Sequence, residues 1–135
     1  MQTDKMVFVF GSNEAGIHGA GAAKYAHDER GAIMGCCFGH THRGDRIGSF
    51  AIPTKDHLIK NTIQRDVIWN YVKAFLIYAG GRPDLKFQVT AIGCGLAGLK
   101  HEDMAAMFWV HPSNCYFDLL WDEYLPAGTR FWGTF

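Results

Sequence analysis

The sequence predicts an α/β fold, a three-layer α/β/α sandwich with a mixed, mainly parallel central sheet. Apolar, strand-like segments alternate with helical patterns along the chain. Glycine-rich loops follow two of these segments, as in sheets that bind ligands at the carboxyl ends of their strands. The first segment, residues 6–10, is apolar at every position, which is typical of a strand buried on both faces. The length of 135 residues suits one domain, expected to cover residues 1–135.

The first half of the chain gives a strand, a loop, a helix and a second strand. Residues 6–10 form the first strand, and residues 11–21 form a glycine-rich loop. A short helix then begins at residues 22–26 and ends in charged residues. The second strand covers residues 47–52 and is predicted to end at Pro53, because proline cannot donate a hydrogen bond to a sheet ladder.

The second half repeats this order. Apolar residues recur three and four positions apart over residues 63–79, which predicts a helix with Thr62 as its N-cap and Gly80 at its end. A third buried strand is expected at residues 87–92. A glycine-rich turn follows, and residues 102–109 form a helix with acidic residues in its first turn.

The last part of the chain predicts one more strand and a packed tail. Residues 115–119 are apolar enough for a strand. The aromatic residues Phe131, Trp132 and Phe135 are expected to pack against the domain rather than to remain free. No internal repeat and no linker interrupt this arrangement.

The charge balance excludes an extended basic surface. Lys and Arg together number 13, as do Asp and Glu, so the formal net charge is zero. Such a chain lacks the field that gives sequence-independent affinity for nucleic-acid backbones. Any phosphate site is therefore expected to be local and to use backbone N–H groups with few charged side chains.

The sequence predicts a cytoplasmic protein without a membrane partner, a metal or a cofactor. It has neither the features of a signal peptide nor the ~20 apolar residues of a membrane-spanning helix, and reduced cysteines are expected. Cys36, Cys37, His40 and His42 are residue types that bind zinc. Adjacent cysteines, however, lack the spacing that favours chelation.

Both glycine-rich loops follow predicted strands and lead toward helices. Backbone N–H groups at a helix start hold anions without help from Lys or Arg, so two such loops predict a diphosphate site. The alternative is that the glycines only allow tight turns. The predicted ligand-binding residues are Gly11, Ser12, Asn13, Gly19, Ala20 and Gly21 in the first loop, and Ile92, Gly93, Cys94, Gly95, Leu96, Ala97 and Gly98 in the second.

These loops carry a resemblance to a known family. Asn13 followed by the small residues 19–23 resembles the first ligand loop of macrodomains, and residues 89–98 with the acidic, alanine-bearing helix that follows resemble the second. The chain is also similar to small macrodomain-like proteins, many of them encoded by phages. The resemblance implies ADP-ribose with its diphosphate between the loops and its distal ribose near Asn13.

The sequence departs from the macrodomain pattern at two places. Many macrodomains have an Asp at the first core strand that binds the adenine amino group, whereas residues 6–10 contain no carboxylate. An aromatic residue usually precedes the final glycine of the second loop, and Ala97 stands there. Adenine recognition is therefore left open.

Four residues near strand ends are catalytic candidates. Asn13 suits a ribose hydroxyl or an attacking water, while Glu14 and His18 suit general acid or base catalysis. Lys55 suits a phosphate contact or nucleophilic attack on the anomeric carbon. The structural alternatives are a loop cap for Asn13, an exposed His18 without a role, and a solvated salt-bridge turn at Lys55 and Asp56.

The sequence therefore favours a binder of ADP-ribose or a related nucleotide diphosphate that hydrolyses an ADP-ribosyl linkage. Its expected partner is that nucleotide or an ADP-ribosylated macromolecule. A non-catalytic binder, or a sponge for an ADP-ribose-derived or cyclic nucleotide signal, is the first alternative. A structural module that has lost its ligand is the second. The oligomeric state is left open.

Overall fold

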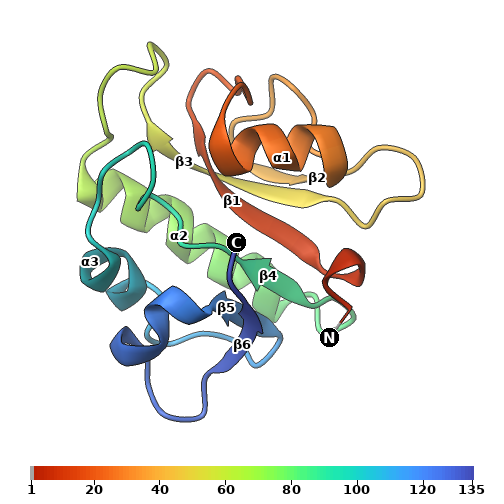
Figure 1. Cartoon of the computed structure of the whole chain (residues 1–135), viewed down its shortest axis with the longest axis vertical. Coiled ribbons are helices and arrows are strands. Elements are labelled where there is room, and N and C mark those ends of the chain that lie inside the picture. The colour runs from red at the N-terminus through yellow and green to blue at the C-terminus, as the bar shows by residue number, and fades with distance from the viewer. Residues whose placement is uncertain (1) are drawn as a thin grey trace.

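The structure is a computed structural model that describes residues 2–135, and it has a six-stranded sheet with helices on both faces (Figure 1). The spatial order of the strands is β2-β3-β1-β4-β5-β6. β2 pairs antiparallel with β3, and every other pairing is parallel. The strands are β1 (Val7–Asn13), β2 (Gly39–Thr41), β3 (Ser49–Lys55), β4 (Phe87–Val89), β5 (Cys115–Asp118) and β6 (Arg130–Gly133). The predicted α/β class with a mixed, mainly parallel sheet is confirmed.

Helices cover the two faces of the sheet unequally. Helix α1 (Gly21–Glu29) packs on one face, and α2 (Arg65–Gly80) and α3 (His101–Ala106) pack on the other (Figure 1). The short 3₁₀ helices are η1 (Thr3–Lys5) and η2 (Leu119–Tyr124). The larger core lies on the α2 and α3 side, because that face carries most of the buried aromatic side chains.

The central strand explains the apolar run at the start of the chain. β1 lies between β3 and β4, so both of its edges are paired. Its side chains alternate between the two faces. Phe8 and Phe10 pack in the α1 layer, and Val7 and Val9 pack in the α2 layer. All four side chains are fully buried, as expected for a strand covered on both faces.

Pro53 does not end the second predicted strand. β3 begins at Ser49 and continues through Pro53 to Lys55, so the strand predicted for residues 47–52 is shifted. β2 pairs only with residues 49–51 of β3. Beyond that point no second strand pairs with β3 in the described part of the chain, and the same edge makes only an isolated bridge from Lys55 to Thr62. Pro53 lies between these two contacts, at an edge position that tolerates a residue without an N–H.

Thr62 is not the N-cap of the long helix. α2 begins at Arg65 after Gln64, whose side chain makes no capping hydrogen bond, and the Asp66 carboxylate accepts the N–H of Val67 at 3.0 Å. The Thr62 hydroxyl instead donates to the backbone oxygen of Ala97 at 2.7 Å. The segment after β3 is thereby joined to the second glycine-rich loop.

The other predicted elements are displaced by a few residues, and two short strands were not predicted. β4 ends at Val89, because Thr90 and the residues after it turn into the loop, and α3 begins at His101. The missed strands are β2 and β6. Of the tail aromatics, Phe131 lies in β6 and Trp132 donates its indole N–H to the backbone oxygen of Val89 at 2.9 Å, so both are packed. Phe135 contacts Phe8 and Tyr25 but is 58% exposed. Within residues 2–135, no helix is both long and apolar enough to span a bilayer.

Candidate functional site

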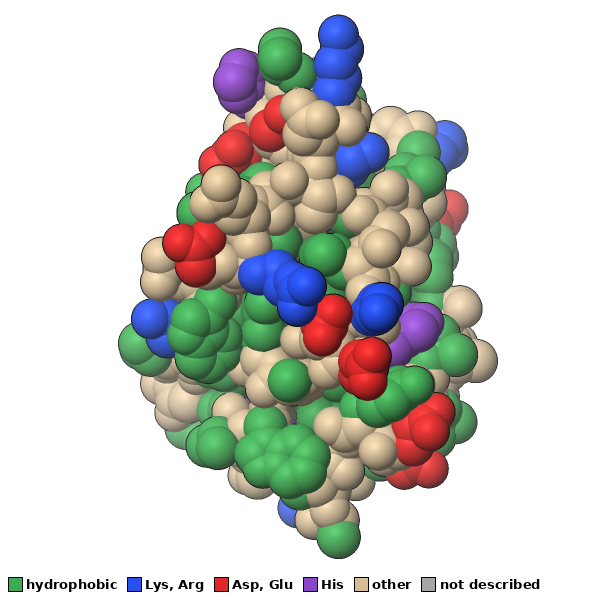
Figure 2. Space-filling view, turned by 90° about the vertical axis from the view of Figure 1, so that its left-hand side faces the viewer, with side chains coloured by type: hydrophobic (Ala, Val, Ile, Leu, Met, Phe, Trp, Pro, Cys, Tyr) green, Lys and Arg blue, Asp and Glu red, His purple; other side chains and the backbone are tan. Residues whose placement is uncertain are grey.

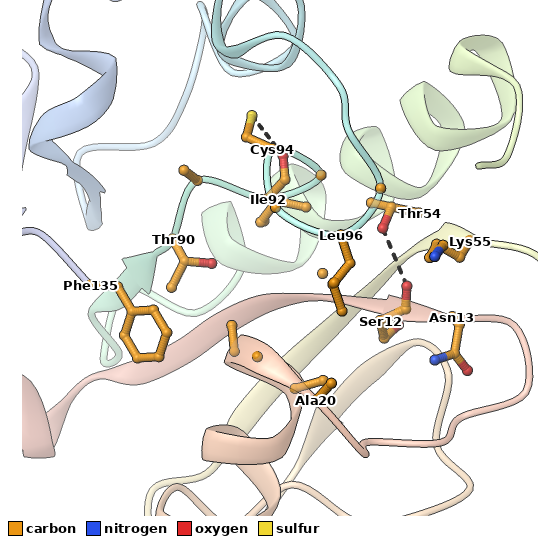
Figure 3. A pocket seen from close by; sticks show the side chains of 18 of the residues that line it. Ser12, Asn13, Ala20, Thr54, Lys55, Thr90, Ile92, Cys94, Leu96 and Phe135 are labelled. Carbon is orange, nitrogen blue, oxygen red and sulfur yellow. Dashed lines mark hydrogen bonds between the residues drawn. The ribbon is translucent and has the colours of Figure 1, made fainter. Parts of the chain in front are cut away.

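A cavity of about 630 Å³ opens at the carboxyl ends of β1, β3, β4 and β5. Its walls are the two glycine-rich loops, the start of α1 and the segment after β3 (Figure 3). This position follows from the parallel pairing, which brings the carboxyl ends of these strands to one edge of the sheet. All of the predicted ligand-binding residues except Gly98 line the cavity.

Asn13 fixes the shape of the first loop. Its side-chain amide donates to the backbone oxygen of Ile17 at 2.8 Å and accepts the backbone N–H of Ile17 at 3.1 Å. Farther along, Gly16 has a φ of +69°, and a Cβ there would lie 2.5 Å from the carbonyl carbon of Gly35. Gly16 is therefore a glycine that the loop itself requires.

The first loop ends in unpaired backbone donors. Over residues 2–135, no side chain caps α1, and the N–H groups of Gly21, Ala22 and Ala23 have no acceptor. These residues line the cavity. The positive end of the α1 dipole thus lies at the cavity wall, where it favours an anion.

The second loop also presents unpaired donors to the cavity. Its internal hydrogen bonds run from Leu99 N–H to Gly93 O at 2.8 Å and from Gly98 N–H to Gly95 O at 3.0 Å. In the described chain, the N–H groups of Gly95, Leu96 and Ala97 have no acceptor. Successive free N–H groups in a turn form an anion-binding concavity.

Gly19 and Gly95 differ from the glycines that the fold requires. Neither has a positive φ, and a Cβ at Gly95 would meet no atom within 4 Å, while one at Gly19 would have only an ordinary contact at 3.9 Å with Ile17. The free protein therefore has room for a larger side chain at both positions. Both residues line the cavity, which is consistent with space kept for a ligand.

Two of the four catalytic candidates line the cavity, and two do not. Asn13 and Lys55 lie side by side at the ends of the paired strands β1 and β3 (Figure 3). Lys55 is the one Lys or Arg among the lining residues in the described chain. Glu14 is exposed, and its carboxylate accepts the hydroxyl of Tyr71 at 3.2 Å, away from the cavity.

His18 is a buried residue of the α1 layer rather than an exposed loop residue. Its side chain is 2% exposed and packs edge-on against Phe10, with 5.3 Å between the ring centroids. Nε2 lies 3.1 Å from the backbone oxygen of Ile33. Burial lowers the pKa of His18, because the charged ring is poorly solvated there. His18 does not line the cavity, so the geometry does not support its predicted role as an acid or base.

The structure adds polar cavity residues that the sequence interpretation missed. Asp118 ends β5, is 1% exposed, and accepts the backbone N–H groups of Leu120 at 2.9 Å and Phe135 at 3.1 Å. His101 lines the same end of the cavity, as do Thr90 and the ring of Phe135. Asn13 was predicted as a site residue because it lies at the end of a strand. Asp118 could have been predicted in the same way, because it ends the parallel strand β5.

Cys94 lies in the second loop but is not an activated thiol. Burial raises the pKa of Cys94 to about 11, and the indole of Trp121 opposes this effect only in part. A cysteine acts as a nucleophile in its thiolate form. The structure therefore offers no support for nucleophilic catalysis by Cys94.

The four zinc-type residues do not converge. The Cys36 thiol donates to the backbone oxygen of Phe38, and His40 lies in β2 rather than in an exposed loop. Both His40 nitrogens have partners, the Tyr78 hydroxyl at 2.7 Å and the backbone oxygen of Ile47 at 2.8 Å. Among residues 2–135, no three His, Cys, Asp or Glu side chains are grouped to hold a metal ion.

Surface charges of both signs are mixed on one face of the molecule (Figure 2). Figure 2 shows basic, acidic and hydrophobic side chains interspersed on the face that it presents. With a formal net charge of zero, long-range attraction of an anion is weak. Affinity for a phosphate then depends on the local donors of the two loops and on Lys55.

Searches of protein-family models, of curated proteins and of solved structures found no match to this chain. A fold class alone does not define a function. The functional conclusion consequently rests on the chemistry of the cavity.

Proposed function

We propose that the protein binds ADP-ribose, or a closely related nucleotide diphosphate, in the cavity at the carboxyl edge of the sheet. The observation that carries this proposal is the pair of loops with unpaired backbone N–H groups, at Gly21–Ala23 and Gly95–Ala97, on the walls of one cavity. Two donor clusters suit the two phosphates of a diphosphate better than they suit a single phosphate.

The size and the lining of the cavity support a nucleotide-sized ligand. Sites for small molecules and cofactors measure about 300–1,000 Å³, and this cavity measures about 630 Å³. Apolar side chains at its rim are exposed to solvent in the free protein, among them Ile17, Leu96, Leu120 and Phe135. A ligand with apolar faces would cover them.

The β5 end of the cavity suits the nucleobase of a nucleotide. The ring of Phe135 offers a face for stacking, and its own position is supported by Phe8 and Tyr25 at centroid distances of 5.6 and 5.2 Å. Asp118 is a buried carboxylate with lone pairs beyond those that its two backbone partners use. In this proposal Asp118 accepts a hydrogen bond from the amino group of the nucleobase. In many macrodomains an Asp at the first core strand does this, and the first strand of this chain has no carboxylate.

Hydrolysis of an ADP-ribosyl linkage is the second candidate, supported by the position of Lys55 beside Asn13. Lys55 reaches the wall where the distal ribose of ADP-ribose would lie. A general base is harder to assign. Glu14 is bonded to Tyr71, and in the described chain Asp118 is the one carboxylate that lines the cavity. Asp118 ends β5, which β1 and β4 separate from Lys55 in β3. Binding is therefore proposed ahead of turnover.

Calorimetric and thermal-shift titrations with ADP-ribose, AMP and ribose 5-phosphate test the proposal. A ligand that binds only the folded protein raises its melting temperature by mass action. ADP-ribose is expected to bind most tightly, because it alone of the three carries a diphosphate. Equal shifts with all three compounds, or none with any, would overturn the proposal.

A further inference from the structure

His101 has a fixed tautomer at the cavity wall. The indole Nε1 of Trp121 lies 3.1 Å from Nδ1 of His101. An indole N–H only donates, so Nδ1 of His101 must accept and cannot carry a proton. The proton of the neutral imidazole is then on Nε2.

The two nitrogens of His101 have different surroundings. Nδ1 is held by Trp121, whose side chain is fully buried against Phe108 and Phe117. Nε2 is on the other edge of the ring, and the contact with Trp121 through Nδ1 is the one hydrogen bond of the ring in the described chain. His101 is half-buried and lines the cavity. The ring thus offers a free donor that the core holds in a set orientation.

We infer that His101 is a specificity-determining residue that donates its Nε2 proton to an acceptor atom of the bound nucleotide, with Trp121 as its positioning residue. This inference rests on the proposed function. The acceptor is either an unprotonated ring nitrogen of the base or a phosphate oxygen. A fixed neutral donor favours a ligand that presents an acceptor at this point and disfavours one that presents an N–H there.

A nucleophilic Cys94–His101 pair is the rival interpretation, and the contacts disfavour it. To activate a thiol, the imidazole needs a nitrogen free to take its proton. The unprotonated nitrogen of His101 is already occupied by Trp121. Burial also raises the pKa of Cys94 to about 11, so little thiolate forms near neutrality.

His111 provides an internal reference for the tautomer. Its Nδ1 lies 2.8 Å from the backbone oxygen of Phe108, which can only accept, so Nδ1 of His111 carries the proton. His111 and His101 are therefore expected to be opposite tautomers. Nitrogen-15 spectra of the imidazoles near pH 8, where histidine is ordinarily neutral, distinguish protonated from unprotonated ring nitrogens at each residue.

Two substitutions of His101 separate the cavity donor from the core contact. His101→Asn keeps an acceptor for Trp121 close to the position of Nδ1 and removes the donor at Nε2. His101→Gln places an amide donor near the position of Nε2. ADP-ribose affinity is expected to fall about five- to tenfold in H101N, as for one lost hydrogen bond, and less in H101Q. His111→Asn is the matched control and should bind like the wild type.

Trp121→Phe tests the positioning role, because it removes the indole N–H but keeps an aromatic ring in the core. The spectra should then show a mixture of His101 tautomers, with His111 unchanged, a result that a merely structural role of Trp121 would not produce. Circular dichroism and a melting curve verify that the variant is folded. An unchanged His101 spectrum in folded W121F would overturn the role of Trp121.

Titrations with adenosine and with inorganic pyrophosphate identify the acceptor. The probe whose addition moves the Nε2 resonance of His101 contains the accepting atom. A proton on Nδ1 of His101 in the wild type, or wild-type affinity of folded H101N for ADP-ribose, would overturn the inference while leaving the proposed function intact. If the wild type binds none of ADP-ribose, adenosine and pyrophosphate, the proposed function fails and the ligand role of His101 fails with it.

Discussion

The side-chain amide of Asn13 holds both the N–H and the carbonyl oxygen of the Ile17 backbone. Asn13 is 7% exposed, yet it also lines the cavity. The loop-cap interpretation of this residue is therefore observed directly. A contact with the ligand stays a prediction, and the two are compatible, because the amide group has a second N–H that Ile17 does not use.

Replacement of Asn13 should loosen the first loop. Asn13→Ala removes two hydrogen bonds and is expected to lower the free energy of unfolding by about 1–2 kcal/mol. It should also weaken ADP-ribose binding, because the loop must then be ordered on binding. Asn13→Asp keeps the acceptor for the Ile17 N–H and should destabilise the protein less. Urea denaturation and calorimetry of the same preparations give both quantities. Unchanged stability with lost binding would mean that the amide acts on the ligand alone.

A bulky side chain at Gly95 should abolish binding without unfolding the domain. The free protein has space for it, since a Cβ there meets no atom within 4 Å. The new side chain would occupy the place where phosphate oxygens meet the N–H groups of the second loop. Gly80→Leu, at an exposed helix end away from the cavity, is the matched control for Gly95→Leu. ADP-ribose titration and far-UV circular dichroism are the measurements. If folded G95L binds like the wild type, the second loop is only a turn.

Gly21 is a less informative position for the same test. Its φ of +56° favours glycine, although a Cβ there meets no atom within 4 Å. A loss of binding in Gly21→Val could then come from a distorted start of α1. Gly19, which has neither a positive φ nor a close neighbour, is the better choice in the first loop.

The sequence was sufficient to predict the fold class and the two loops, because both depend on local patterns. Buried parallel strands are apolar throughout, and ligand loops at their carboxyl ends need small residues. The strands β2 and β6 were missed because each has at most four residues and is defined by its partner strand rather than by its own pattern. Pro53 was misinterpreted because an edge position of this kind is a tertiary feature.

The candidate site shows the same division between local and tertiary information. The positions of Asn13 and Lys55 follow from the strand ends where they lie. His18 is in the same loop as several predicted ligand-binding residues, but its ring packs against Phe10, and no sequence pattern indicates that direction. His101 lines the cavity and is hydrogen-bonded to Trp121, 20 residues away in the chain. Side-chain direction in loops and contacts between distant residues are set by packing, which a single sequence does not display.

The stability of the protein is expected to fall with acidification below about pH 6.5. Burial lowers the pKa values of His18 and His40 in the folded state. The neutral His40 ring also fits its contacts, since it accepts from the Tyr78 hydroxyl and donates to the backbone oxygen of Ile47. Between the folded pKa and the ordinary value near 6.5, the unfolded chain binds more protons than the folded one. The free energy of unfolding therefore decreases as the pH falls through this window.

Urea denaturation between pH 7.5 and pH 5 measures this dependence. His40→Gln should reduce the slope of the free energy of unfolding against pH, and the exposed His57→Gln serves as its control. A free energy that does not change over this range would contradict the assignment of both buried histidines as neutral groups.

Lys55 should contribute to affinity through its charge. Lys55→Met keeps most of the side-chain length and removes the one Lys or Arg charge that lines the cavity within residues 2–135. A hydrogen bond to a charged group is worth about 1.5–3 kcal/mol, so the dissociation constant for ADP-ribose should rise at least about tenfold. The effect should shrink at high salt. Lys60→Met, on the exposed loop nearby, is the control. Equal affinities of K55M and the wild type would remove Lys55 from the phosphate site.

Ile59 combines a strained backbone with a place in the cavity wall. Its φ is 60°, and in the described chain it is the one non-glycine residue with a positive φ. A left-handed conformation costs an L-residue about 1–2 kcal/mol, and β-branched residues adopt it least readily. Such strain persists where function or the surrounding structure requires the residue. The loop around Ile59 is held by Asp56, whose carboxylate accepts the N–H groups of Lys60 and Asn61.

Ile59→Asn should separate stability from binding. Asparagine adopts the left-handed conformation with less strain, so the free energy of unfolding should stay the same or rise by about 1 kcal/mol despite the lost apolar side chain. Affinity for ADP-ribose should fall, because the apolar side chain no longer lines the cavity. Leu58→Asn, at the neighbouring and 60% exposed position, is the matched control and should change neither quantity. A destabilised I59N that keeps its affinity would show that Ile59 supports the loop rather than the ligand, and that its backbone strain is offset by packing alone.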